Sequence, residues 1–96
     1  MALLTVVARI RAKEGAEDAV ASELKKLIAP GRAEKGCVGY DLHRSVEDPT
    51  LFIFYETWES RHLLERHMTS PHMKRYLAAT EGLIESWELD LLEKMS

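Results

Sequence analysis

Four segments of the chain have the alternating, β-branched and aromatic composition that is typical of β-strands. Glu14-Gly15 breaks the first of them. Glu47-Asp48-Pro49-Thr50 has the chemistry of a turn between the second and third, so we expect these two to form a hairpin. The predicted strands are Leu3–Ala12, Cys37–Val46, Leu51–Glu59 and Ser86–Glu93.

Helical spacing follows the first strand. After Ala16, apolar residues recur at the i, i+4, i+7 and i+8 positions of one helical face. These residues are Val20, Leu24, Leu27 and Ile28. Pro30-Gly31 is predicted to bend or end this helix, because proline lacks the N–H that a helix interior needs.

The region between the third and fourth strands has two helix-start signals. Ser60 is a good N-cap for a short helix that ends at His67 or Met68. Ser70-Pro71 is a stronger signal, because serine caps a helix and proline suits its first position. This segment is predicted to reach about Glu81 and to stop at Gly82. The resulting order, β-α-β-β-α-β, predicts a ferredoxin-like α+β fold with a four-stranded antiparallel sheet.

The strand patterns also indicate which strands lie inside the sheet. The first and third strands are apolar on both faces, whereas the second and fourth are polar on one, so the first and third are predicted to be central. Two helical regions cover only one face of such a sheet, and the other face would expose an apolar patch that a soluble monomer rarely tolerates. We therefore expect a homodimer that packs sheet against sheet.

The composition is that of one ordinary globular domain. A chain of 96 residues has room for a single core, so we expect one domain over residues 1–96. Thirteen Lys and Arg against sixteen Asp and Glu give a net charge of −3, which offers no basic surface to nucleic acid or an anionic membrane. A single cysteine excludes a disulfide framework and a multi-cysteine zinc site. We expect a cytoplasmic protein.

Histidines supply the candidate acid–base chemistry, because their ordinary pKa of about 6.5 lies close to neutral pH. His67 and His72 flank the break between the two predicted helical segments. Either could act as a general base or hydrogen-bond donor at the mouth of a pocket between helices and sheet, or be a cap or surface histidine. The i, i+5 spacing of His62 and His67 does not place two ring nitrogens on one helical face, so we expect no metal site.

Aromatic and methionine side chains could line an apolar pocket for a flat ring, since aromatics offer stacking area and methionine adapts its shape. Alternatively, they form the core of a small domain. The candidate substrate-binding residues are Trp58, Phe54, Tyr40, Met68, Met73 and Tyr76.

The remaining polar residues point less directly to chemistry. Cys37 has no sequence neighbour that would lower its pKa and is interpreted as a small buried hydrophobe. Glu23, Glu56 and Glu59 are candidates for a carboxylate that orients a histidine. No glycine-rich phosphate loop or dinucleotide fingerprint is visible, so no cofactor is expected. The arginines, which could bind phosphate but are more often solvated, are Arg9, Arg11, Arg32, Arg44 and Arg75.

A series of short motifs resembles the antibiotic biosynthesis monooxygenase (ABM) family over nearly the whole chain. They are Ile28-Ala29-Pro30, Arg32-Ala33-Glu34, Gly36-Cys37, Tyr40-Asp41-Leu42-His43-Arg44-Ser45, Phe54-Tyr55-Glu56-Thr57-Trp58 and His67-Met68-Thr69-Ser70-Pro71-His72. The resemblance implies a dimeric α+β barrel, with the strand-end Trp58 beside its cavity. Members of the family include cofactor-independent oxygenases of quinols and anthrones, haem-degrading enzymes, an isomerase of a phosphorylated sugar and many uncharacterised proteins.

The haem-degrading branch fits this chain poorly. Its members carry an axial histidine about two turns into the last helix and an asparagine on the first strand. The corresponding stretches here are Tyr76-Leu77-Ala78 and Ala8-Arg9-Ile10, and the chain contains no asparagine.

The resemblance therefore predicts a cofactor-independent monooxygenase. In this hypothesis His67 or His72 deprotonates a small aromatic quinol or anthrone, which then reacts with O2 in an apolar pocket. Trp58, Phe54 and Met73 would hold the ring. Two alternatives stay open, because fold does not imply function. One is an isomerase of a small hydroxy-ketone, and the other is a non-catalytic dimer that binds an aromatic ligand.

Overall fold

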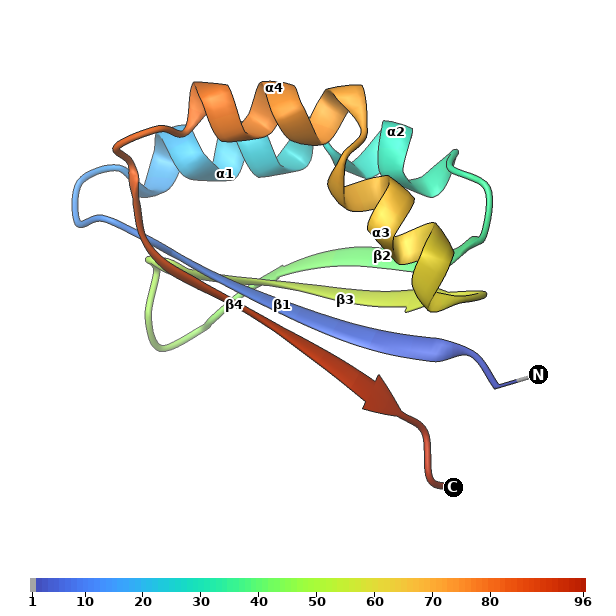
Figure 1. The fold of residues 1–96 in the computed structure, drawn as a ribbon. Coiled ribbons are helices and arrows are strands. Elements are labelled where there is room, and N and C mark those ends of the chain that lie inside the picture. The colour runs from blue at the N-terminus through green and yellow to red at the C-terminus, as the bar shows by residue number, and fades with distance from the viewer. Residues whose placement is uncertain (1) are drawn as a thin grey trace.

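The computed structural model describes residues 2–96, which form one antiparallel sheet with all the helices on one of its faces (Figure 1). The strands are β1 (Leu4–Ala12), β2 (Cys37–Arg44), β3 (Leu51–Trp58) and β4 (Ile84–Glu93). The helices are α1 (Glu17–Lys25), α2 (Ile28–Arg32), α3 (Arg61–Met68) and α4 (Pro71–Ala79). The predicted ferredoxin-like α+β order is confirmed, with each helical region divided in two.

The order of strands across the sheet is β2-β3-β1-β4, which confirms that the first and third strands are central. Each of the three strand pairs is antiparallel. Along β3, Phe52, Phe54 and Trp58 are buried against the helices, whereas Tyr55 points to the open face and is 49% exposed. The period of two in the sequence thus separates the face that builds the interior from the face that does not.

The first helical region breaks earlier than Pro30-Gly31, where the sequence predicted its end. The helix α1 ends at Lys25, and a new five-residue helix, α2, begins at Ile28 and contains both residues. Pro30 therefore lies in the first turn of a helix, where the missing N–H would have no intrahelical partner in any case. Gly31 is buried, and a Cβ built there would lie 2.5 Å from Tyr40 Cε2. This close approach is what requires glycine.

The second helical region breaks where the sequence predicted. Ser60 caps α3 by accepting a hydrogen bond from Leu63 N at 3.2 Å. Ser70 caps α4 by accepting one from Met73 N, and its own hydroxyl donates to His67 O at 2.6 Å. The serine thus ties the last turn of α3 to the first turn of α4 and fixes the angle between them.

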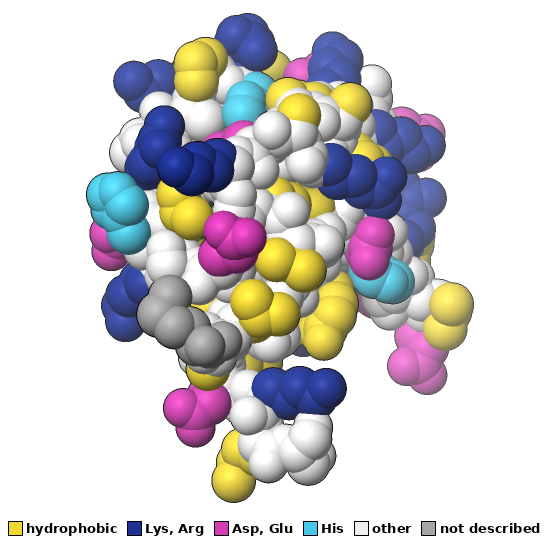
Figure 2. Space-filling view, turned by 90° about the vertical axis from the view of Figure 1, so that its right-hand side faces the viewer, with side chains coloured by type: hydrophobic (Ala, Val, Ile, Leu, Met, Phe, Trp, Pro, Cys, Tyr) yellow, Lys and Arg dark blue, Asp and Glu magenta, His cyan; other side chains and the backbone are white. Residues whose placement is uncertain are grey.

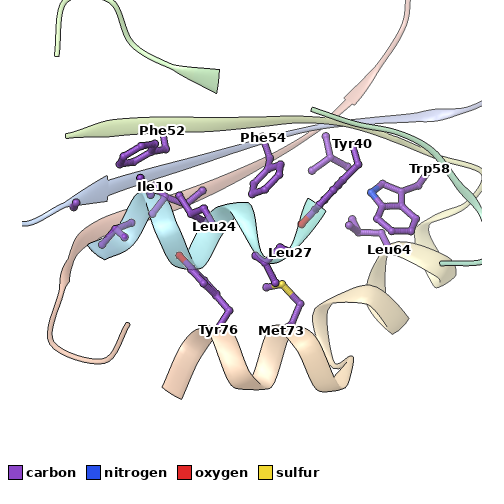
Figure 3. Packing of buried hydrophobic residues seen from close by; sticks show 14 residues of the cluster. Ile10, Leu24, Leu27, Tyr40, Phe52, Phe54, Trp58, Leu64, Met73 and Tyr76 are labelled. Carbon is purple, nitrogen blue, oxygen red and sulfur yellow. The ribbon is translucent and has the colours of Figure 1, made fainter. Parts of the chain in front are cut away.

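The core fills the layer between sheet and helices (Figure 3). Phe54 of β3 stacks on Tyr40 of β2, with ring centroids 4.4 Å apart. Leu27 from the turn after α1 and Met73 of α4 lie opposite these rings (Figure 3). Apolar contact of this kind contributes most of the stability of a small domain.

The other face of the sheet carries no helix (Figure 1). Along it, Val7 pairs with Tyr55 and Thr5 pairs with Leu92, while Arg9 lies between Ile53 and Glu88. Figure 2 views the end of the molecule where both termini lie and shows hydrophobic side chains gathered between charged ones. Within residues 2–96, no helix has both the length and the apolar character needed to cross a membrane.

Candidate functional site

A pocket of about 310 Å³ opens between α4 and the sheet. Its volume lies near the lower end of the range for small-molecule sites, about 300–1,000 Å³. The wall is largely apolar, with side chains from β1, β4 and α1 as well as from α4. The residues of the wall that carry a polar side-chain atom are Tyr40, Glu56, His67, Tyr76, Thr80, Glu81 and Trp87.

A chain of three polar side chains begins on the wall of this pocket, which Tyr40 and His67 line, and ends outside it at Glu34. Glu34 Oε2 accepts a hydrogen bond from His67 Nδ1. Because Nδ1 of the neutral ring then carries the hydrogen, His67 Nε2 is left as an acceptor. The hydroxyl of Tyr40 donates to that nitrogen at 3.3 Å. The chain Tyr40–His67–Glu34 therefore runs from the pocket wall to the carboxylate.

The break between α3 and α4 brings the two predicted histidines to the same carboxylate. His67 is in the last turn of α3, and His72 is in the first turn of α4. His72 Nε2 donates to Glu34 Oε2 at 2.8 Å, so one oxygen serves both rings. His72 does not line the pocket, whereas His67 does. The structure thus gives the two histidines different positions that the sequence did not distinguish.

Burial sets the protonation of this chain. Only 2% of the His67 side chain is exposed, and loss of water lowers the pKa of His67, although the hydrogen bond and charge of Glu34 oppose this effect. His67 is therefore neutral at neutral pH and can accept a proton. Burial, followed by the charges of Glu56 and Glu34, raises the pKa of Tyr40 well above its ordinary value. Tyr40 consequently keeps its hydrogen and acts as a donor.

A second carboxyl group, that of Glu56, lies on the same wall. It points from β3 toward the helices and is 3% exposed. Glu56 Oε1 accepts a hydrogen bond from Trp58 Nε1 at 2.8 Å. Burial raises the pKa of Glu56 to about 7, while the Trp58 hydrogen bond lowers it and the charge of Glu34 raises it. A carboxyl group with this pKa exchanges protons at neutral pH.

The Arg32 side chain and the close approach of Gly31 to Tyr40 hold the loop between α2 and β2 in place. Arg32 at the end of α2 donates from Nε to Tyr40 O at 3.1 Å and from Nη2 to Asp41 Oδ1 at 3.0 Å. With Gly31 against the Tyr40 ring, these contacts fix both ends of the loop that carries Glu34. The loop is thereby positioned next to α3 and α4 although it is far from them in sequence.

Most of the predicted ring-binding residues line the pocket, but one of them lies outside it. Tyr40, Phe54, Met68, Met73 and Tyr76 belong to the wall. Trp58 does not; it is fully buried, with its ring centroid 4.9 Å from that of His67. Its indole N–H is committed to Glu56. Trp58 therefore supports the polar groups instead of touching the space where a ligand would lie.

The carboxylate that orients the histidines was not among those that the sequence suggested. Glu23 pairs with Lys26 on the surface of α1, and Glu59 is exposed. Glu34 takes this role across 33 and 38 positions of sequence, a distance at which no local spacing could have indicated the contact. Glu56, in contrast, had a visible signal, since it interrupts an otherwise apolar face of β3.

Two further residues, Trp87 and Cys37, lie close to the site. Trp87 of β4 was not predicted to contribute, yet it lines the pocket and is 62% exposed, so it lies at the mouth. Cys37 is half-buried, and burial together with the charge of Glu56 raises the pKa of its thiol. It is therefore protonated at neutral pH, and it packs against the core, although it is only half-buried and not buried as predicted.

Ligand atoms of Glu34, His67 and His72 all lie within 4.8 Å of one another, close enough to share a metal ion. The sequence predicted no metal site, because neither its single cysteine nor the spacing of His62 and His67 suits one. In the structure the carboxylate is already hydrogen-bonded to both rings, which accounts for the cluster without an ion.

Comparison with known proteins gives consistent matches. The family model "Antibiotic biosynthesis monooxygenase" matches residues 3–79. "Probable quinol monooxygenase YgiN" of Escherichia coli is 33% identical over 101 aligned positions, which cover 95% of this chain and 97% of that protein. Rv0793 of Mycobacterium tuberculosis is 37% identical over 81 positions, or 84% of this chain and 79% of that protein. The crystal structure of PA3566 from Pseudomonas aeruginosa superimposes with a TM-score of 0.95 at 38% identity, covering 100% of this chain and 97% of the other.

Proposed function

The chain belongs to the antibiotic biosynthesis monooxygenase family, and we propose that it oxygenates a small aromatic quinol or anthrone without a cofactor. The observation that carries the proposal is an apolar pocket whose wall includes Tyr40 and His67 of the Tyr40–His67–Glu34 chain. A quinol or anthrone that has lost a proton is an electron-rich anion, which can itself reduce O2. The protein then has to bind the ring, accept the proton and exclude water.

The proton of the substrate follows the hydrogen-bonded chain. The substrate hydroxyl gives its proton to Tyr40 Oη as Tyr40 passes its own to His67 Nε2. The carboxylate of Glu34 stabilises the imidazolium that forms, since it accepts from His67 Nδ1. In this assignment His67 is the base, and His72 holds Glu34 in place.

Apolar side chains hold the ring and keep water out. Phe54 and Tyr40 offer a stacked aromatic wall from the sheet, and Met68 and Met73 close the side formed by α3 and α4. In such surroundings the charge of the substrate anion interacts strongly with fixed donors. The phenol of Tyr76, whose pKa burial raises to about 12, is a further donor on the wall.

The pocket favours this reaction over isomerisation of a phosphorylated hydroxy-ketone. Among residues 2–96, no arginine or lysine lines the pocket, so a phosphate would have no cationic partner there. In the non-catalytic alternative, the protein stores or senses an aromatic ligand in the same pocket. It differs from the oxygenase because it binds the ligand without turnover.

We propose further that the open face of the sheet is covered by a second copy of the chain. Tyr55 and Leu92 are 49% and 45% exposed on it, and the family resemblance implies a sheet-to-sheet dimer. Sedimentation velocity of the native protein should show a dimer, and Tyr55→Lys should shift it to a monomer. A monomeric native protein would refute this assembly. We assign the protein to the cytoplasm, in keeping with its lone free cysteine.

The test of the proposed reaction is oxygen uptake by the purified protein with a panel of quinols and anthrones, after subtraction of autoxidation. We expect uptake above background that falls by about 10²–10⁴-fold in His67→Gln. His62→Gln is the matched control, because His62 is exposed on the same helix. It should leave uptake unchanged.

The alternatives give different results in the same experiment. Turnover that persists without oxygen would identify an isomerase. Saturable binding with uptake at background would identify a ligand-binding protein. Equal losses in His67→Gln and His62→Gln would mean that the proton does not pass through His67.

A further inference from the structure

The proposed proton route gives no role to the carboxyl of Glu56, a buried polar group of the pocket wall. Its Oε1 is engaged by the indole N–H of Trp58, and Oε2 has no hydrogen-bond partner. Across residues 2–96, the one buried side-chain oxygen or nitrogen that is enclosed without a partner is Glu17 Oε1. Glu56 Oε2 is therefore not enclosed, and because Glu56 belongs to the pocket wall, this oxygen faces the pocket.

The groups around Glu56 favour its protonated form. In the sheet it pairs with Val6 on β1 and with Tyr40 on β2. The titratable groups that act on it or lie beside it are Tyr40 and Cys37 of β2, Glu34 of the preceding loop, His67 of α3 and Tyr76 of α4. The helix α1 contributes only Leu24 and the adjoining Leu27 to this wall. None of these groups is a permanent cation, so among the described residues the Trp58 N–H alone opposes the cost of a buried negative charge at Glu56.

The second half of an oxygenation requires an acid as well as a base. After deprotonation, O2 takes electrons from the substrate anion and forms a C–O bond, and the peroxide oxygen recovers the proton held by His67. The hydroperoxide must then lose water. The carbon that carries the peroxide gives its proton to the Tyr40–His67 pair and forms a C=O bond. At the same time the O–O bond breaks and hydroxide leaves. That hydroxide needs a proton. In sum, one quinol and one O2 give one hydroxyquinone and one water.

We propose that Glu56 is a second acid–base residue of this site and gives its proton to the hydroxide that leaves when the O–O bond breaks. The inference rests on the proposed oxygenation. Glu56 recovers the proton from the neighbouring Tyr40–His67 pair, because Tyr40 and Glu56 are paired residues of adjacent strands. Two acid–base groups of the same pocket wall thus act in different steps. His67 acts in the first proton transfer and Glu56 in the last.

Trp58 acts through Glu56 and is a positioning residue. Its N–H holds Oε1 and leaves Oε2 free to face the pocket. This hydrogen bond also lowers the pKa of Glu56. Loss of the N–H should therefore extend the protonated form of Glu56 to higher pH.

The test measures oxygen uptake and quinone formation separately, with hydroperoxide measured by a peroxide-reactive dye in acid-quenched samples. In Glu56→Gln we expect uptake close to that of the native protein, quinone formation slower by about 10²-fold, and accumulated hydroperoxide. Glu56→Asp, which keeps an acid, should restore part of the quinone formation. Glu59→Gln makes the same change at an exposed position nearby and should alter neither rate.

Each other outcome overturns a defined part of the inference. Quinone formed as fast as oxygen is consumed in Glu56→Gln would refute the role of Glu56 alone. Uptake that falls together with quinone formation, in a variant with native circular dichroism, would move Glu56 to the first step and refute its role as the acid. A native protein without uptake above background would refute the proposed oxygenation itself.

The pH profile of Trp58→Phe gives an independent readout that a merely structural role would not change. We expect the alkaline limb of quinone formation to move to higher pH, because Glu56 stays protonated longer without the N–H donor. A lower rate with an unmoved limb would mean that Trp58 only fills space.

Discussion

Two glutamates belong to the site, Glu56 on the pocket wall and Glu34 behind His67, and the partners of each give it a different role. Glu34 faces two imidazole rings, and both N–H groups converge on one of its oxygens. Glu56 accepts a hydrogen bond from one indole N–H, and within residues 2–96 no permanent cation lies beside it. The first carboxylate can hold and stabilise a positive charge, whereas the second is driven toward its neutral form. The identity of the side chain therefore does not determine its chemistry; the neighbours do.

The positions of the two glutamates in the fold explain the difference. Glu34 lies in the loop between α2 and β2, and 18% of its side chain is exposed. Glu56 lies near the C-terminal end of β3, one of the two central strands, on the face that the helices cover. A loop residue can turn toward partners at the surface, while a residue on the inner face of a central strand can use only what its neighbours provide.

The largest expected effect comes from Trp58→Ala, because Trp58 contacts both Glu56 and His67. Its N–H holds Glu56 and its ring lies against His67. Removal of this fully buried ring should lower the free energy of unfolding by about 3–5 kcal/mol. Chemical denaturation measures this change in the free energy of unfolding. Trp87→Ala is the control, since Trp87 is largely exposed and its loss should cost less than about 1 kcal/mol. Equal losses would mean that Trp58 is not a core residue.

The next effect isolates Glu56 through the pH dependence of stability. With its pKa near 7 in the folded protein against about 4.5 in the unfolded chain, the folded state binds more protons between these values. The contribution of Glu56 to stability is therefore complete below pH 4.5 and is lost as the pH rises through 7.

Glutamine does not titrate, so Glu56→Gln should gain stability relative to the native protein as the pH rises. The total gain should be about 2–3 kcal/mol between pH 4.5 and pH 8, at about 1.4 kcal/mol per pH unit in the window. Denaturant titrations at several pH values measure this difference. The lowered pKa of His67 is common to both proteins and cancels. A difference that is constant with pH would contradict the buried, protonated state of Glu56.

A smaller effect tests the other glutamate. Glu34 raises the pKa of His67, so Glu34→Gln should lower that pKa further and weaken the base. We expect oxygen uptake to fall by about tenfold and its acid limb to move to lower pH. The pH profile of uptake measures both changes. His72→Ala leaves the Glu34–His67 contact in place and should have a smaller effect, whereas a larger one would make His72 the base.

The smallest expected effect separates a hydrogen-bonded cluster from a metal site at Glu34, His67 and His72. If the hydrogen bonds alone hold the cluster, exhaustive dialysis against EDTA should leave oxygen uptake unchanged. Uptake that is lost on dialysis and restored by a divalent cation would assign the cluster to a metal instead.

The fold could be predicted because its signals are local. Alternation along β3 and the cap at Ser70-Pro71 each involve only a few consecutive residues, and both gave the correct element. The break in the first helical region was predicted at the wrong residues, because that prediction also used only a local signal. Proline breaks a helix interior but not its first turn, and only packing determines where that first turn begins.

The site was predictable only where a local pattern sufficed. Tyr40 and Met73 line the pocket because they lie on the inner face of their own elements, which periodicity shows. The contact between Glu34 and His67 depends on how a loop meets a helix, and no spacing encodes it. Trp58 was assigned to the pocket from its aromatic side chain and from the resemblance, but it does not line the pocket: its ring lies against His67 and its N–H is bound to Glu56.

Because the two tryptophans differ in exposure, the intrinsic fluorescence of the protein can report the binding of a ligand. Trp58 is fully enclosed, while Trp87 stands at the mouth of the pocket with most of its indole in water. The red-shifted part of the intrinsic emission therefore originates from Trp87. A ring that enters the pocket would displace water from this indole and either shift its emission to the blue or quench it. Titrations that follow this signal could rank candidate ligands without a label and without turnover.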